Sequence, residues 1–216
     1  GYDGVFVTDN GGSDWENHWL PIVPARGAWN MSMLDDERGF LLGSRWTDAD
    51  PLLLYRTVDG GLTWCGVEGS YASVLRSVVS IEFIDEDRGW AGGGVIMATS
   101  DGGTTWQLQM ESATVREFEF TTPLNGYAVG GRAIMRTIDG GAEWIDIAPD
   151  DERIVDLRGV CFLDQDNGWI AGRGRQETIG DRLCSYSVIL STADGGTTWE
   201  IREFGYDVTG DVSQTR

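Results

Sequence analysis

The sequence contains no lysine and a single histidine. All 16 basic residues are arginines, and 35 acidic residues bring the net charge to −19. Phosphate backbones and anionic membranes repel such a chain, so we expect no nucleic-acid binding. No run of 18 apolar residues is present, so no membrane insertion is expected either. The chain begins at Gly1 without a recognisable signal peptide, and we expect a mature or truncated form.

Residues that usually carry metal or redox chemistry are few and scattered. Cys65, Cys161 and Cys184 lack the spacing of metal ligands, and a disulfide between Cys161 and Cys184 is left open. His18 has no cysteine, serine or second histidine in a recognisable motif beside it. We therefore expect no metal, no cofactor and no catalytic residue.

One eight-residue pattern, Thr-x-Asp-Gly-Gly-x-Thr-Trp, recurs along the chain. Its copies span residues 8–15 (a looser version), 57–64, 99–106, 137–144 and 192–199. Adjacent glycines accept the positive φ of tight hairpin turns, the Asp or Asn can bond nearby backbone amides, and the Trp supplies an apolar anchor. The residues with this structural role are Asn10, Trp15, Asp59, Trp64, Asp101, Trp106, Asp139, Trp144, Asp194 and Trp199. Catalytic constellations occur once, so repetition of these aspartates argues against catalysis or calcium binding.

A second pattern, Asn/Arg-Gly-aromatic-x-x-Gly, precedes four of the copies. It begins at Arg38, Arg88, Asn125 and Asn167. An alternating strand comes before it, and further strands flank the Asp-Gly-Gly turn, which gives four antiparallel strands in about 40 residues. The sequence thus predicts an all-β protein, a β-propeller of four-stranded blades with five such turns. We divide the single domain 1–216 into a half blade, 1–23, blades 24–72, 73–112, 113–150 and 151–204, and a tail or closing strand, 205–216.

The eight-residue pattern resembles the Asp-box, or bacterial neuraminidase repeat. Together the two patterns are similar to the photosystem II stability/assembly factor-like family of propellers. This resemblance covers essentially the whole chain and implies a non-enzymatic, protein-binding scaffold or assembly factor. It also implies more blades, commonly seven, so that the chain is either a five-bladed ring or part of a larger propeller. Glu143 and Asp14 depart from the second Thr of the box, and Asn10 from its Asp.

Loop lengths predict where a partner binds. The first-to-second strand turn and the box keep a fixed length, whereas the second-to-third connection varies, and variable loops on a rigid scaffold commonly carry binding. Acidic turns at 35–37, 85–87 and 164–166 lie on the box side. Arg45, Arg132, Arg173 and Arg175 lie toward the variable loops, where bidentate contacts could recruit a carboxylate-rich partner. The stretch from Gly172 to Ser187 is expected to be the longest irregular one.

Three functions remain open. The first is a protein-binding propeller that acts as an assembly factor, scaffold or accessory subunit, in an extracytoplasmic (periplasmic, secreted or cell-surface) bacterial setting. The second is a sialidase-like glycoside hydrolase, which requires converging arginines and a Tyr–Glu pair that no local motif arranges. The third is a structural block of a larger extracellular assembly. Carbohydrate is a less expected partner than protein.

Overall fold

The computed structural model describes residues 4–19, 25–45, 53–69, 78–111, 113–179 and 182–207. These ranges form one two-stranded and four four-stranded antiparallel sheets, and no helix. No helix long and apolar enough to cross a membrane therefore occurs in this part of the chain. The chain divides into two compact units, Gly1–Ala113 and Thr114–Arg216, which are described separately.

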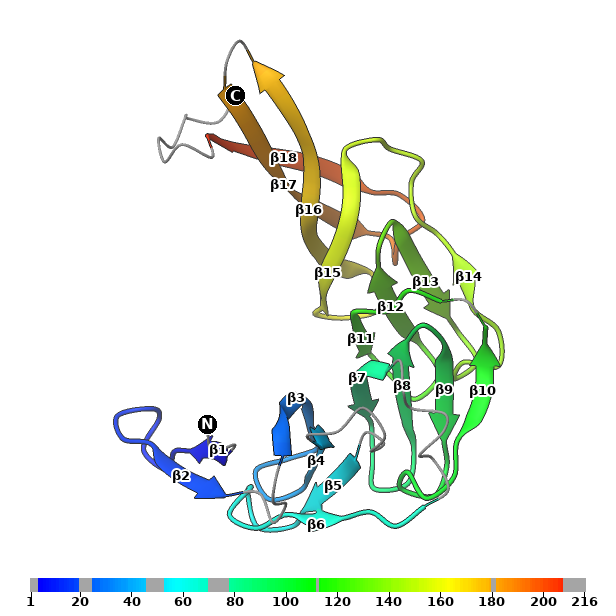
Figure 1. Ribbon diagram of the computed structural model, residues 1–216. Coiled ribbons are helices and arrows are strands. Elements are labelled where there is room, and N and C mark those ends of the chain that lie inside the picture. Colours follow the sequence, from blue (N-terminus) through cyan, green and yellow to red (C-terminus); the bar gives the residue numbers. More distant parts are fainter. Residues whose placement is uncertain are drawn as a thin grey trace. The chain divides into compact units, whose positions relative to one another are not determined.

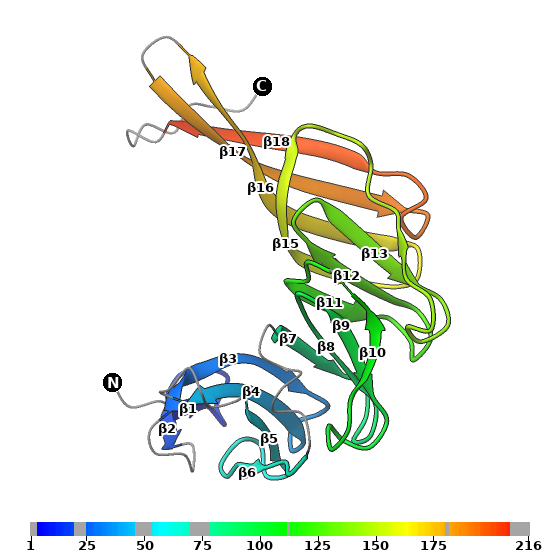
Figure 2. The same ribbon diagram turned by 45° about the vertical axis from the view of Figure 1, so that its right-hand side comes forward.

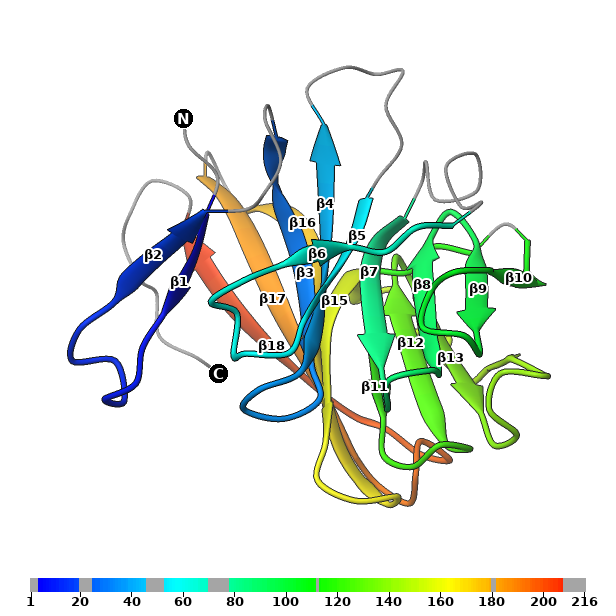
Figure 3. The same cartoon turned by 90° about the horizontal axis from the view of Figure 1, so that it is seen from below.

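The first unit contains a hairpin and two complete sheets. The hairpin, best seen in Figure 3, pairs β1 (Gly4–Val7) with β2 (Glu16–Trp19). The next sheet contains β3 (Ala25–Met33), β4 (Gly39–Arg45), β5 (Leu53–Thr57) and β6 (Cys65–Gly66) in chain order. The third contains β7 (Val78–Phe83), β8 (Gly89–Gly93), β9 (Ile96–Thr99) and β10 (Gln107–Met110), as Figure 1 shows.

The second unit consists of two sheets of unequal length. The shorter contains β11 (Glu117–Phe120), β12 (Gly126–Gly130), β13 (Ala133–Thr137) and β14 (Ile145–Asp146). The longer contains β15 (Ile154–Phe162), β16 (Asn167–Ile179), β17 (Arg182–Ala193) and β18 (Glu200–Asp207). In both sheets the strand order is the chain order, which is the up-and-down pattern of a propeller blade.

This strand order confirms the prediction of four-stranded antiparallel blades with an Asp-box between the third and fourth strands. The sequence predicts third strands over 52–55, 95–98, 132–135 and 187–190. The first three shift by a residue or two, so that Arg132 lies in the turn before β13, and the fourth is the much longer β17. The expected outer strand after Trp199 is β18, and residues 208–216 of the predicted tail lie outside the described part.

The prediction of an irregular stretch from Gly172 to Ser187 is wrong. β16 and β17 continue as a paired hairpin as far as Ile179 and Arg182. The register of β15 on β16 ends at the Ile154–Gly174 pair, so the hairpin extends past the first strand of its own sheet, as Figure 2 shows. The extra length of this repeat therefore forms regular β-structure.

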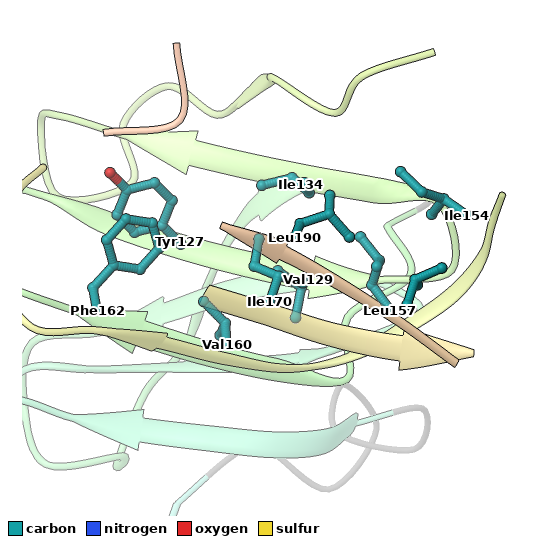
Figure 4. Packing of buried hydrophobic residues seen from close by; sticks show 10 residues of the cluster. Tyr127, Val129, Ile134, Ile154, Leu157, Val160, Phe162, Ile170 and Leu190 are labelled. Carbon is teal, nitrogen blue, oxygen red and sulfur yellow. The ribbon is translucent and has the colours of Figure 1, made fainter. Parts of the chain in front are cut away.

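Aromatic stacking joins neighbouring sheets within each unit. In the first unit, Phe40 of β4 stacks on Phe83 of β7 with ring centroids 3.6 Å apart. In the second, Tyr127 of β12 stacks on Phe162 of β15 at 3.8 Å. Figure 4 shows this second stack beside the aliphatic side chains of the same core. In these two repeats the aromatic residue of the Gly-aromatic pattern therefore packs against the next sheet, whereas Trp169, in the last sheet, is 43% exposed.

Polar side chains on the first strands make a second link between sheets. The Asn30 side-chain oxygen on β3 accepts a bond from the Ile81 amide on β7 at 2.9 Å. In the second unit Glu117 of β11 takes the same role, because its Oε2 accepts from the Val160 amide on β15 at 3.1 Å. Side chains that alternate with the apolar residues of these strands thus satisfy backbone donors of the following strand.

Candidate functional site

The Asp-box turns share one hydrogen-bond network. Their glycines have φ of 66–74° at the first position and 85–89° at the second. In the copy at 99–106, the Asp101 carboxylate accepts bonds from the hydroxyls of Thr99 at 2.9 Å and Thr105 at 2.6 Å, and from the Thr105 amide at 2.8 Å. The Gly103 amide donates to the Thr99 hydroxyl at 2.9 Å, and the Trp106 indole donates to the Gly103 carbonyl at 3.0 Å.

This network determines the chemistry of the box carboxylates. The hydroxyl and amide of the second Thr lower the pKa of Asp59, Asp101 and Asp194, and the Glu143 amide is the first cause of the lowered pKa of Asp139. A carboxylate stabilised in its ionised form is a poor proton donor. The box aspartates therefore close turns, in agreement with the role expected from their repetition.

Two copies depart from the pattern in different ways. In the first copy, donor and acceptor are reversed. The side-chain amide of Asn10, at the box Asp position, donates to the carboxylate of Asp14, at the second Thr position, at 3.0 Å. In the copy at 137–144, the Glu143 amide still donates to Asp139 at 3.0 Å, but a glutamate has no hydroxyl to donate to the second carboxylate oxygen. The first departure replaces the missing bond, whereas the second does not.

The box tryptophans differ in burial. Trp64 and Trp144 are buried, Trp106 and Trp199 are partly buried, and Trp15 of the looser copy is 58% exposed. The anchor role therefore applies fully to two copies and least to the first.

The predicted acidic turns are occupied by local bonds. Asp35 accepts from the amides of Glu37 and Arg38 and from the Arg38 guanidinium, whose side-chain bond is the main reason that its pKa falls to about 2. Asp85 makes the same bonds with the following residues of its turn, and Glu86 pairs with arginines of the preceding sheet. The turns at 35–37 and 85–87 thus stabilise themselves and their neighbours within the first unit. The turn at 164–166, in the second unit, is closed in the same way by the amides of Asp166 and Asn167, which donate to Asp164.

The four predicted partner-binding arginines have different environments. Arg45 is the last residue of β4 in the first unit, and its side chain lies outside the described part. Arg132 donates to the carbonyls of Ile154 at 2.7 Å and of Asp151 at 3.1 Å, so it supports the loop before β15.

The other two predicted arginines lie on β16. The guanidinium of Arg175 lies 5.4 Å from the centroid of the Tyr186 ring, and its Nε lies 3.3 Å from a carboxylate oxygen of Glu203. Arg173 is exposed, and none of the ion pairs among the described residues involves it. Arg173 is therefore the predicted arginine that is best placed to meet a partner.

Strand pairing brings Arg132 and Arg173 to one end of the second unit. Gly131, beside Arg132, forms a bridge with Leu157, and Leu157 pairs with Gly172, beside Arg173. Two strand spacings, about 10 Å, therefore separate the backbones at the two arginines. The backbones at Arg132 and Arg173 thus lie near each other, and the shared arginine surface stays a prediction.

A pocket that the sequence did not reveal lies at the opposite end of the shorter sheet, beside its box turn. It has a volume of about 370 Å³. Its lining residues are Arg136, Ile138, Asp139, Glu143, Ile145 and Ile147. The available sequence signal was the departure at Glu143, which now lies in the pocket wall.

The cysteines and the histidine form no recognisable chemical site. All three cysteines are free. Cys161 pairs with Trp169 and Cys184 with Glu177, eight residues further along β16 (177 − 169 = 8), which is about 26 Å and too far for a disulfide. Among the described residues, no three His, Cys, Asp or Glu side chains gather as metal ligands. His18 lies 3.7 Å from the carboxylate of its neighbour Glu16.

Comparisons with known proteins agree with the fold. No family model and no curated protein matches the sequence. Among solved structures, YCF48 bound to D1 peptide matches with a TM-score of 0.57 and 18% identity, over 91% of this chain and 74% of that one. YCF48 from Cyanidioschyzon merolae matches with a TM-score of 0.58 and 16% identity, over 92% and 78%.

An ancestral GH74 enzyme also matches, with a TM-score of 0.65 and 14% identity. The match covers 99% of this chain but 29% of that one. At these identities the likeness concerns the fold alone. The protein therefore has a β-propeller fold, whole or partial, built of four-stranded antiparallel blades.

Proposed function

We propose that the protein is a non-enzymatic, protein-binding propeller that serves as an assembly factor, scaffold or accessory subunit. One observation carries the proposal. Arg173 is exposed on the extended β16–β17 hairpin and makes none of the ion pairs among the described residues. A guanidinium that forms no ion pair with a described residue can bind a carboxylate in a bidentate manner. The likeness to a YCF48 that was solved with a bound peptide supports the same class of function.

The shape of this surface favours a protein partner. Beyond the end of β15, the edge of β16 from Arg175 to Ile179 has no first strand paired with its backbone groups. Extended peptides commonly add to such an edge as a further strand. Ile179 is 55% exposed and Leu183 43%, so apolar contacts accompany the charge. A carboxylate-bearing segment that crosses this hairpin would combine all three interactions.

The experiment is affinity co-purification from the native cells, followed by direct binding with the identified and purified partner. Arg173→Glu should weaken binding at least tenfold, since it reverses one charge in a contact between ionised groups. Arg202→Glu is the matched control, because Arg202 is exposed and pairs with its neighbour Glu200. Arg132 is unsuited to this test, because a substitution there would also remove its bonds to the backbone carbonyls of the loop before β15.

Equal binding by the two reversals would contradict the proposed surface. Loss of the partner with Arg202→Glu and its retention with Arg173→Glu would place the contact elsewhere on the second unit. Binding should also weaken as salt rises, because charged contacts at exposed sites are screened over about 10 Å at 0.1 M.

A glycoside hydrolase is the second candidate, and two carboxyls favour it. Glu117 and Glu119 lie on one face of β11, and burial is the first cause of the raised pKa of both. A carboxylic acid with a raised pKa is the group that protonates a glycosidic oxygen. Glu117, however, already accepts the Val160 amide in the link between sheets, which leaves Glu119 as the candidate acid.

Fluorogenic glycosides, a sialoside among them, test this alternative. We expect no turnover by the purified chain. Turnover that disappears in Glu119→Gln and persists in Glu117→Gln would favour the hydrolase over the binding function.

An extracytoplasmic location is part of the proposal. Fractionation of the native cells, with an antibody against the chain, tests it directly. Recovery in the cytoplasmic fraction alone would contradict this location without bearing on the binding surface.

A further inference from the structure

Arg136 lies in the wall of the pocket beside the box turn of the shorter sheet. It pairs across β13 with Tyr127 on one side and Ile145 on the other. Its guanidinium carbon is 5.9 Å from the centroid of the Tyr127 ring, and its buried Nε has no hydrogen-bond partner. Among the ion pairs of the described residues, none involves Arg136.

The equivalent arginine in the first unit makes an ion pair that Arg136 does not make with any described residue. Arg56, at the same place in its third strand, forms an ion pair with Glu86 in the first turn of the next sheet. Gln165 occupies in its sheet the position that Glu86 occupies in the other unit. In each sheet the backbone carbonyl oxygen of this residue faces the first glycine of the box, and a Cβ on that glycine would lie 2.8 Å from Gln165 and 2.9 Å from Glu86. A neutral amide therefore stands where the turn that faces Arg56 supplies a carboxylate, and Arg136 forms no ion pair with a described residue.

The remaining walls of the pocket are apolar and acidic. Ile138 and Ile145 are 64% and 55% exposed, and Ile147 completes the aliphatic surface. Asp139 and Glu143 form the other side. Asp139 is committed to its turn through the Thr137 hydroxyl and the Glu143 amide. A volume of about 370 Å³ is at the small end of the range for ligand sites.

We propose that this pocket binds a carboxylate joined to a branched aliphatic group. The carboxylate meets Arg136, and the aliphatic group covers the isoleucines. A free branched-chain acid and an acidic residue beside an aliphatic one in a peptide present the same chemistry. The two acidic side chains of the wall disfavour ligands with a second negative charge. The site is independent of Arg173, so the inference stands whether or not the proposed function holds.

The experiment follows isoleucine methyl signals of the full chain by NMR during titration. In the first arm the probe is 4-methylpentanoate, compared with its neutral amide. In the second arm it is the peptide acetyl-Leu-Glu-Leu-amide, compared with acetyl-Leu-Gln-Leu-amide. At least one carboxylate probe should shift the methyls of Ile138, Ile145 and Ile147. Its neutral counterpart should bind at least tenfold more weakly, as expected for loss of a charge-assisted hydrogen bond.

Two variants change the charge by different routes. Arg136→Gln removes the cation, and Gln165→Glu supplies the carboxylate that the other unit provides, without altering a lining residue. Both should weaken binding at least tenfold, whereas Arg56→Gln, the matched change in the first unit, should leave it intact. Binding that survives in both pocket variants, equal binding of the neutral probes, or absence of methyl shifts with both carboxylates would overturn the proposal. The arm that binds identifies the source of the carboxylate.

Discussion

Replacing Phe162 by alanine tests whether the stack on Tyr127 holds the two sheets of the second unit together. Phe162 is 6% exposed, and its ring lies 3.8 Å from that of Tyr127 with an angle of 8° between the planes. Buried Phe→Ala changes cost about 3–5 kcal/mol, since they combine lost burial with a residual cavity. Ile170, Leu157 and Leu190 in the same cluster belong to paired strands, so the site cannot collapse easily. We therefore expect a loss of about 4 kcal/mol.

For a chain of about 200 residues, each kcal/mol lowers the melting temperature by about 2–4 °C. The expected shift is therefore about 8–16 °C, measured by calorimetry. If the two units unfold in separate transitions, the shift belongs to that of Thr114–Arg216 and, for a unit of about 100 residues, rises to about 16–32 °C. Leu163→Ala is the matched control, because Leu163 is the next residue and 75% exposed. It should change stability by less than about 0.5 kcal/mol. Equal effects of the two substitutions would refute the idea that the stack joins the sheets.

Two further predictions concern the box and the loop before β15. Glu143→Thr restores the hydroxyl that the pattern provides as a donor to the box aspartate, here Asp139, so the denaturation midpoint should rise. Thr198→Glu makes the reverse change in an intact copy and should lower the midpoint. Midpoints that move the other way would contradict the turn network. Asp151 has its pKa lowered to about 2, chiefly by side-chain bonds from Arg153, so its contribution is present above the unfolded value of 3.8 and is lost as pH falls from about 4 to 2. Asp151→Asn should therefore flatten the acid loss of stability in that window, and an unchanged pH profile would count against this bond.

The repeats explain why the fold was predictable from the sequence. Gly-Gly pairs, box hydroxyls and the Gly-aromatic pattern are local devices, and each was confirmed in its strand or turn. The extended hairpin was not predictable in the same way. From Arg175 to Ile179 it lies past the end of the β15 pairing, so no apolar alternation marks these residues as a strand. Alternation of apolar and polar residues indicates a strand with one buried face, so a strand with no buried face cannot be told from a loop by its sequence pattern.

The candidate sites were only partly predictable, because charge state depends on contacts between sheets. The sequence selected Arg132 as a partner-binding residue, whereas the structure shows its guanidinium bound to backbone carbonyls of the loop before β15. It gave no reason to single out Arg136. The difference between Arg136 and Arg56 lies in a residue of the following sheet, Gln165 instead of Glu86, and only the packed sheets show that these positions face each other.

In a repeat protein, a departure that weakens the repeat carries information, because the other copies show what stability favours at that position. With Glu143 in place of threonine, its turn lacks a hydroxyl donor. With Gln165 in place of a carboxylate, Arg136 lacks the ion pair that Arg56 makes with Glu86. Both belong to the surroundings of one pocket, although they lie in different sheets. In the first copy, by contrast, Asn10 and Asp14 compensate each other by a direct bond. Two such departures around a single arginine favour a binding site, because an arginine paired with the turn of the next sheet, as Arg56 is with Glu86, is less available to a ligand.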